Sequence, residues 1–337
     1  MPPSALVRAL PKVQLHCHLE GTVAAATFRS LAEAHGVDIG VRGRGPLEGT
    51  YAFGTFREFL LTFADVCRAL STPADFARIA REYAHDARAQ NVRYAEVFVS
   101  PSVWTFFHRS LDVRETVRAM RAEFDAAARE GGPMVRFIFD LTRNFGLERA
   151  AATARCAVEL AEFGVIGIGL GGDEANFPAE LYAEPFAFAR THGLRTVAHA
   201  GEAAGARSVR NAIDVLGAER IGHGVRALED DALVEELARR GIALEICPTS
   251  NRLTGAVPAG APHPIGELDR RGVICAIDAD DPALFSTTLE AEYALVEEQL
   301  GAAAIARFAR QAVENSFAPL GLKGKLLLET AIVARNY

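Results

Sequence analysis

Short apolar segments rich in valine and isoleucine alternate with longer segments of helical periodicity along most of this 337-residue chain. Strands that read as continuous apolar runs are typical of parallel sheets whose faces are both covered by helices. The eight candidate strands are residues 13–18, 92–99, 135–143, 165–172, 195–202, 220–225, 242–251 and 273–282. Eight strands that alternate with helices predict an α/β fold, a (β/α)8 TIM barrel, with a doubly wound sheet as the alternative.

One spacing in this alternation is irregular. About seventy residues separate the first two candidate strands, whereas a plain strand–helix–strand unit needs only ~30. We therefore expect a helical insertion, about residues 24–90, within a single domain that spans residues 1–337. Residues 55–70 place Phe56, Phe59 and Phe63 on one face of a helix. We interpret this face as packing against the barrel, with a lid over a binding pocket as the alternative.

Composition and charge exclude several classes of protein. The net charge is −7 without any basic block, which disfavours binding to nucleic acid or to a membrane surface. The five cysteines are scattered and form no CxxC pair, which favours a reducing compartment. No secretory signal and no membrane-spanning segment is apparent. We expect a cytoplasmic protein that acts on a small-molecule substrate. A homo-oligomer is compatible with this composition.

Polar residues gather at the carboxyl ends of the candidate strands. They are His16, His18, Glu20, Asp173, Glu174, His199, Glu202, His223, Asp280 and Asp281. Each has an ordinary structural explanation by itself, such as a core histidine that bonds to the backbone. In a barrel, however, these ends converge at one mouth, where the active sites of this fold lie. The shared position therefore predicts a functional site.

The chemistry of these residues indicates metal-assisted hydrolysis. Alternate residues of a strand face the same way, so His16 and His18 can share an ion. Three neutral imidazoles and one carboxylate suit Zn²⁺, which lowers the pKa of water, although Fe²⁺ or Mn²⁺ would fit a similar shell. A histidine can hold the water, and a glutamate can serve as general acid. The fourth strand ends in "GLGGDE" without a lysine to bridge two ions, so we expect one metal ion per chain.

Six ordered motifs carry a resemblance to a known family. They are "HCHLEG", "GGDE", "HAGE", "GHGV", "CPTSN" and "DADDP", spread over about residues 10–320. In this order they resemble the adenosine deaminase family of the amidohydrolase superfamily. The resemblance implies hydrolytic removal of the 6-amino group from a purine.

The same resemblance implies roles for individual residues. Zinc would be held by His16, His18, His199 and Asp280. Glu202 would protonate ring N1, and His223 would orient and activate the attacking water. Asp281 would contact N7 and must therefore carry a proton, which a low-dielectric site beside another carboxylate encourages. The backbone N–H of Gly172 would contact N3, and His18 and Glu20 would also line the substrate site.

Departures from the family pattern bear on the substrate. Glu20 stands where adenosine deaminases usually have an aspartate that contacts the ribose 5′-hydroxyl. Adenine deaminases share this glutamate but commonly have an aspartate at the position of Gly222. A glutamate combined with "GHG" is found in aminodeoxyfutalosine deaminases, which act on a 5′-extended adenosine. The sequence therefore favours an adenine nucleoside, adenosine or a 5′-modified relative.

Three alternatives stay open at this point. Free adenine is the nearest alternative substrate. A zinc hydrolase of esters or phosphoesters on the same barrel would not need Glu202 as an acid for N1. A non-catalytic metal-binding or scaffold protein would not need the acidic groups at the barrel mouth. The nucleic-acid deaminases are disfavoured because their PCxxC signature does not occur in this chain.

Overall fold

The structure is a computed structural model that describes residues 2–38 and 51–337. In this part of the chain, eight parallel strands follow one another around a single sheet in the order β1 to β8. The strands are β1 Lys12–His18, β2 Val92–Val99, β3 Met134–Thr142, β4 Val165–Gly171, β5 Arg195–Ala200, β6 Arg220–His223, β7 Ala243–Ile246 and β8 Cys275–Ile277. This order confirms the predicted barrel, because a doubly wound sheet reverses its strand order at one point.

The ring closes between the segment after β8 and the first strand. Cys17 and Asp280 form an isolated parallel bridge. The backbone N–H of His18 donates to the carbonyl of Asp280 at 2.9 Å, and the N–H of Asp280 donates to the carbonyl of His16 at 3.1 Å. Barrel closure itself therefore brings Asp280 beside the two histidines of β1.

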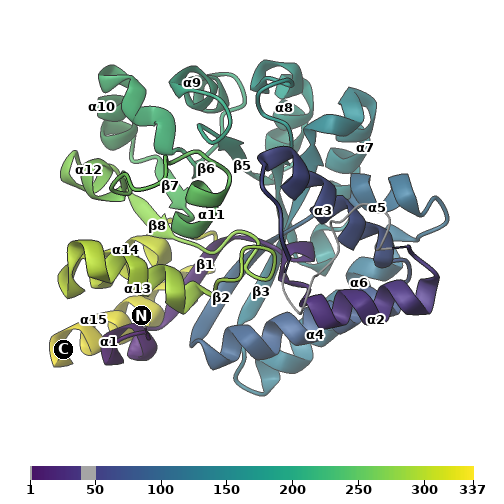
Figure 1. Ribbon diagram of the computed structural model, residues 1–337, viewed down its shortest axis with the longest axis horizontal. Helices are drawn as coiled ribbons and strands as arrows, with labels where there is room; N and C mark the ends of the chain where they lie inside the picture. The colour runs from purple at the N-terminus through teal and green to yellow at the C-terminus, as the bar shows by residue number, and fades with distance from the viewer. Residues whose placement is uncertain (1, 39–50) are drawn as a thin grey trace.

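Helices surround the strands, and both chain ends lie on the same side of the molecule (Figure 1). Their apolar faces pack on the outward face of the strands in one large core that includes Cys17. The α-helices of the described residues are α1 Ala5–Ala9, α2 Ala25–His35, α3 Phe56–Ala69, α4 Pro73–Ala89, α5 Pro101–Phe107, α6 Val113–Arg129, α7 Gly146–Glu159, α8 Ala183–Thr191, α9 Ala206–Asp214, α10 Asp231–Arg240, α11 Pro248–Leu253, α12 Ile265–Arg270, α13 Leu289–Leu300, α14 Ala302–Asn315 and α15 Leu320–Asn336. None of the helices in the described ranges is long and apolar enough to cross a membrane.

The helical insertion after β1 contains α2, α3 and α4, while its residues 39–50 lie outside the described residues. α3 coincides with the helix predicted over residues 55–70. Phe59 is buried and its ring stacks on Phe285 at 4.9 Å, as packing against the barrel predicts. Phe63 is half-buried, and its ring lies 5.9 Å from the ring of His18. The helix thus contacts both the core and the mouth of the barrel, and the lid stays a prediction.

Two of the predicted strands are too long. Residues 242–251 divide into β7 and α11, and residues 273–282 contain only the short strand β8. The division falls at Pro248, the first residue of α11, because proline is pre-organised for the first position of a helix. Most of the polar motifs therefore lie in loops that follow short strands. That residues 1–337 form a single domain stays a prediction.

Candidate metal and active site

The four predicted metal ligands come together although they are far apart in the sequence. His16 and His18 lie at the end of β1, His199 in β5, and Asp280 after β8. Nε2 of His18 is 3.0 Å from Nε2 of His199. Oδ1 of Asp280 is 3.4 Å from Nε2 of His16 and 3.5 Å from Nε2 of His18. Two groups of potential ligands meet at Asp280, one with His16, His199 and His223 and the other with His18 and Asp281.

These residues fit a divalent metal ion. Nε2 of His16 is buried and contacts no hydrogen-bond partner among the described residues. Burial lowers the pKa of His18 to about 3 and that of His199 well below its usual range, so both imidazoles are neutral. Neutral imidazoles and a carboxylate are the donors that zinc prefers when sulfur is absent. The four residues therefore bring together imidazole and carboxylate donors, and their role as the ligands of a metal ion stays a prediction.

The outer nitrogens of two histidines orient their rings. Nδ1 of His16 contacts Oε2 of Glu245 at 2.7 Å, and Nδ1 of His199 contacts the carbonyl of Leu170 at 3.1 Å. Both partners are acceptors, so each Nδ1 carries a proton and each Nε2 can offer its lone pair to a metal. Burial opposes charge on His16, but its contacts with Asp280 and Glu245 raise its pKa well above the usual value. A proton at Nε2 of His16 must therefore leave when a metal binds.

Backbone geometry at the site is unusual. His223 has φ of 62° and Asp280 has φ of 61°, a left-handed conformation that side-chain-bearing residues rarely adopt and that clusters at functional sites. Gly222 is required for a different reason, because a Cβ there would lie 2.7 Å from Cε1 of His16. The imidazole of His16 thus packs so closely on this backbone that no side chain fits at position 222.

Glu202 lies on a loop that another carboxylate holds in place. Oε1 of Glu174 accepts the backbone N–H of Gly201 at 2.7 Å. Its Oε2 accepts those of Glu202, Ala203 and Ala204 at 3.1, 2.7 and 2.9 Å. Oε2 of Glu202 lies 3.6 Å from Nε2 of His223. Burial, and then the charges of Asp280 and Glu174, raise the pKa of Glu202 to about 8. Glu202 is therefore protonated at neutral pH, as a general acid requires.

The surroundings of Asp281 favour the protonated form on which its predicted contact with N7 depends. It is buried, and its Oδ1 contacts no hydrogen-bond donor among the described residues. Burial and the adjacent charge of Asp280 raise its pKa well above the usual value. Space for this carboxyl group comes from Gly21, where a Cβ would lie 1.8 Å from Oδ1 of Asp281. Asp281 can therefore donate a hydrogen bond to an acceptor in the site.

Glu20 is anchored to the end of β2 and to α5. Its Oε1 accepts the backbone N–H of Ser100 at 2.9 Å and the indole N–H of Trp104 at 2.6 Å. Its Oε2 is buried without a donor among the described residues. Burial raises the pKa of Glu20 to about 7 despite these bonds. One oxygen of Glu20 thus stays available to a ligand.

Gly172 lies where β4 turns away from the barrel. Its φ of 93° is in the left-handed region, and a Cβ there would lie 2.5 Å from Oδ1 of Asn144. The same Asn144 oxygen accepts the N–H of the next residue, Asp173, at 3.0 Å. This turn therefore needs glycine for both its conformation and its close contact.

Beneath the histidines lies a charged network that the sequence reasoning missed. Nε of Arg220 donates to Oε1 of Glu245 at 2.6 Å, and its Nη2 donates to Oε2 of Glu96 at 2.5 Å. Oε1 of Glu96 accepts the N–H of Phe317, whose ring lies 3.8 Å from the Arg220 guanidinium carbon. We call Glu96, Arg220 and Glu245 the floor network. The sequence signal for this network was the presence of charged residues within apolar strands. The sequence did not show which of these residues contact one another.

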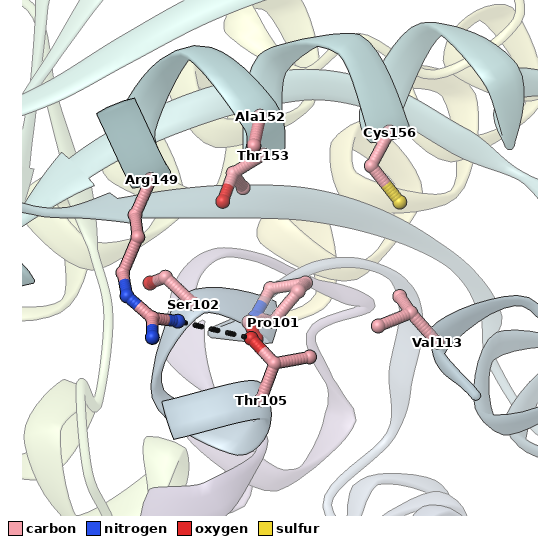
Figure 2. A pocket seen from close by; sticks show the side chains of 8 residues that line it. All are labelled: Pro101, Ser102, Thr105, Val113, Arg149, Ala152, Thr153 and Cys156. Carbon is pink, nitrogen blue, oxygen red and sulfur yellow. Dashed lines mark hydrogen bonds between the residues drawn. The ribbon is translucent and has the colours of Figure 1, made fainter. Parts of the chain in front are cut away.

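A separate hollow of about 170 Å³ lies between α5 and α7. Figure 2 shows Arg149 and Thr153 of α7 facing Ser102 and Thr105 of α5 across it. The guanidinium of Arg149 donates to Oγ1 of Thr105 at 3.5 Å. None of the residues that line this hollow is an acid or a histidine. It is therefore distinct from the cluster at the strand ends.

The barrel and the buried histidine and carboxyl cluster at its strand ends define a metal-dependent hydrolase of the amidohydrolase type. The sequence profile described as adenosine deaminase matches residues 11–332. The chain therefore belongs to the adenosine deaminase family, and it is an aminohydrolase.

Relatives and solved structures agree with this assignment. The chain is 35% identical to the aminodeoxyfutalosine deaminase of Streptomyces avermitilis, over 96% of this chain and 91% of that protein. It is 36% identical to the adenine deaminase of Rhizobium leguminosarum bv. trifolii, over 91% of this chain and 95% of that protein. A crystal structure of an amidohydrolase from Burkhoderia ambifaria with bound zinc is 28% identical, with a TM-score of 0.86 over 100% of this chain and 96% of that one. Relatives of similar identity are named for different purine substrates.

Proposed function

We propose that this chain hydrolyses the 6-amino group of an adenine nucleoside, adenosine or a 5′-modified adenosine such as 6-aminodeoxyfutalosine, with one zinc ion per chain. The products are the inosine-type nucleoside and ammonia. The observation that carries this proposal is a protonated acid, Glu202, that lies beside His223 and the metal-ligand cluster. An ester substrate has no ring nitrogen that needs a proton, whereas a purine that loses its 6-amino group has one at N1.

The zinc ion would be held by His16, His18, His199 and Asp280. When bound there, zinc supplies a Lewis acid and lowers the pKa of a water molecule. The acceptors at Nδ1 of His16 and His199, which leave Nε2 of both rings to face the site, support this ligand set. His223 lies in the same group of potential ligands, and we assign it to the attacking water instead.

The side chains of the site supply the remaining chemistry. Glu202 gives its proton to N1 as water adds to C6, which places the negative charge on the carboxylate and not on the ring. The carboxylate of Glu202 then takes the proton that the water loses and passes it to the 6-amino group, so that the C6–N bond breaks and ammonia leaves. The proton of the new C6 hydroxyl group returns to Glu202 as the C6 carbonyl forms. Asp281, protonated, donates to N7, and the N–H of Gly172 donates to N3. These two hydrogen bonds hold the purine at its acceptor nitrogens N7 and N3. They thereby direct C6 toward the water.

Glu20 supports a nucleoside whose 5′ position is modified. Its Oε1 is occupied by Ser100 and Trp104, so only Oε2 can accept a hydrogen bond from the substrate. Glutamate is also one methylene longer than the aspartate usual in adenosine deaminases. A hydroxyl group of the sugar or of its 5′ substituent is the donor that we assign to Oε2.

The test is a substrate panel with the zinc-loaded protein. Adenosine, 6-aminodeoxyfutalosine and adenine are followed by the loss of 6-aminopurine absorbance and by release of ammonia. We expect the highest kcat/KM with a nucleoside. Highest activity on adenine would select the free base, for which the Rhizobium leguminosarum relative is the precedent. Absence of ammonia release with all three substrates would disprove the proposal.

The cytoplasmic location expected from the sequence stays a prediction.

A further inference from the structure

The outer nitrogen of His223 has a different kind of partner from those of His16 and His199. Nδ1 of His223 lies 3.0 Å from Nδ2 of Asn251, which belongs to α11. An amide NH₂ group can only donate, so Nδ1 of His223 must accept. A neutral imidazole that accepts at Nδ1 carries its proton at Nε2. His223 thus presents an N–H to the site, where His16 and His199 present lone pairs.

The orientation of the Asn251 amide is fixed by a second histidine. Oδ1 of Asn251 lies 3.2 Å from Nε2 of His263, and an amide oxygen can only accept. Nδ1 of His263 in turn accepts the backbone N–H of Ile265 at 3.3 Å. If the Asn251 amide were reversed, the proton of His263 would move to Nδ1 and face this N–H. The backbone amide therefore gives the whole chain of bonds a single direction.

Burial fixes the direction of these hydrogen bonds, because no water can replace a missing donor or acceptor. Asn251 is fully buried, and His223 and His263 are 1% and 4% exposed. Ile265 is the first residue of α12, so its N–H has no acceptor within the helix and needs one elsewhere. Burial, and then the charge of Arg252, lower the pKa of His263 to about 4. The ring of His263 therefore holds no second proton at neutral pH that would change the pattern.

We infer that Asn251 and His263 are positioning residues that hold His223 as the tautomer with its proton at Nε2. His223 consequently donates a hydrogen bond to the oxygen of the attacking water and does not serve as a metal ligand. Distance alone does not separate these roles, because His223 lies within 4.8 Å of the other potential ligands. The inference rests on the proposed function for the identity of the attacking water, but the tautomer itself does not depend on the substrate.

The decisive variant is Asn251→Asp. A carboxylate can only accept, so it would draw the proton of His223 to Nδ1 and leave a lone pair at Nε2. We expect kcat to fall roughly 10³-fold, since a wrong histidine tautomer costs a hydrolase about that factor or more. We also expect KM to stay within about threefold and one zinc per chain to be retained, because the substrate contacts and the ligand set are unchanged. Exposed Asn336 at the end of α15 gives the matched control, Asn336→Asp, which should keep full activity.

A spectroscopic readout tests the tautomer without turnover. In the ¹⁵N NMR spectrum of the zinc-loaded protein, His223, assigned through the His223→Gln variant, should show a protonated Nε2 in the unmodified chain. It should show a protonated Nδ1 in Asn251→Asp. An unprotonated Nε2 in the unmodified chain would overturn the inference. So would an unchanged kcat in Asn251→Asp. Because this spectrum needs no substrate, failure of the proposed function and failure of the inference are distinguishable.

His263 offers a rescue experiment. Glutamine at this position can donate to Oδ1 of Asn251 and accept from the N–H of Ile265, whereas leucine can do neither. We expect His263→Gln to keep kcat within about tenfold and His263→Leu to lose at least tenfold more. Equal kcat values for these two variants would show that His263 only fills space and would overturn its assigned role.

Discussion

The carboxyl groups at the mouth of the barrel and those on its floor are all buried, but they differ in what they contact. Every carboxylate oxygen of the floor network has a partner: Arg220 twice, His16 and the N–H of Phe317. At the mouth, Glu20, Asp140 and Asp281 each keep one buried oxygen without a donor among the described residues. The first arrangement stabilises the fold, and the second holds groups ready for a ligand.

The pKa values follow this division only in part, since burial also raises the pKa of Glu96 on the floor. Burial raises the pKa of Glu20 and of Asp140 to about 7 and that of Glu202 to about 8. On the floor, the charge of Arg220 and the contact with His16 outweigh burial and lower the pKa of Glu245. Glu20, Asp140 and Glu202 therefore favour the neutral form, whereas Glu245 favours the ionised form. Four predictions test this comparison.

The largest effect is expected from Glu202→Gln at the mouth. Glutamine keeps the shape of the side chain but cannot give a proton to N1, so kcat should fall roughly 10³-fold. The midpoint of thermal unfolding should stay the same or rise, because a buried acid is replaced by a neutral amide. Steady-state kinetics and a thermal melt on the same zinc-loaded sample check both parts. Retained hydrolysis would contradict the assigned role of Glu202.

The floor should respond in the opposite way to Arg220→Met. This change leaves Glu96 and Glu245 buried without their shared cation, which should lower the free energy of unfolding by about 3 kcal/mol. Denaturant titration measures the loss. As a control, Arg93→Met removes a half-exposed arginine that pairs with Glu329 and should cost less than about 1 kcal/mol. A loss no greater than that of the control would mean that the floor network does not stabilise the fold.

The pH dependence of kcat/KM should show the raised pKa of Glu202. The general acid must be protonated in the free enzyme, and its pKa of about 8 keeps it so at neutral pH. Activity should therefore be retained at pH 7 and fall about tenfold per pH unit above pH 8. A pH series of kcat/KM at constant zinc loading measures this limb. The residual activity of Glu202→Gln should lack it, and a limb that persists in this variant would belong to another group.

The smallest effect is expected at Asp140, which the sequence reasoning did not single out. Its carboxyl group lies in the barrel against Gly171, where a Cβ would be 2.4 Å from its Oδ2, and its Oδ1 has no donor among the described residues. Asp140→Leu removes this unsatisfied group at similar volume and should raise the free energy of unfolding by about 1 kcal/mol. Thermal melts of Asp140→Leu and Asp140→Asn measure it. A destabilised leucine variant would place Asp140 with the floor network instead.

The fold and the gathering of polar residues at the barrel mouth were predictable because their signals are local. Apolar runs mark the strands, and a polar residue at the end of such a run is visible without any partner. His16, His18, His199, Glu202, His223, Asp280 and Asp281 were all found in this way. The ends of β7 and β8 were misplaced because polar residues beyond a strand do not show where its hydrogen bonds stop.

The partners that hold these residues could not be predicted, because each pair joins distant parts of the chain. Glu174 was noticed as a polar strand end, but its bonds to the N–H groups of residues 201–204 depend on how two loops meet. His263 gave no signal at all, since one histidine in a loop has no pattern. The link from Ile265 through His263 and Asn251 to His223 exists only after β6, α11 and α12 are packed together.

The sequence by itself therefore determined the barrel and the gathering of histidines and carboxyl groups at its strand ends, because these depend on periodicity and on residue chemistry. Only the tertiary structure decided which carboxyl groups are protonated, which nitrogen of each histidine faces the site, and which oxygen of Glu20 is left for a substrate. Those properties depend on burial and on the donor or acceptor that each group meets, and both arise when the strands close into a ring.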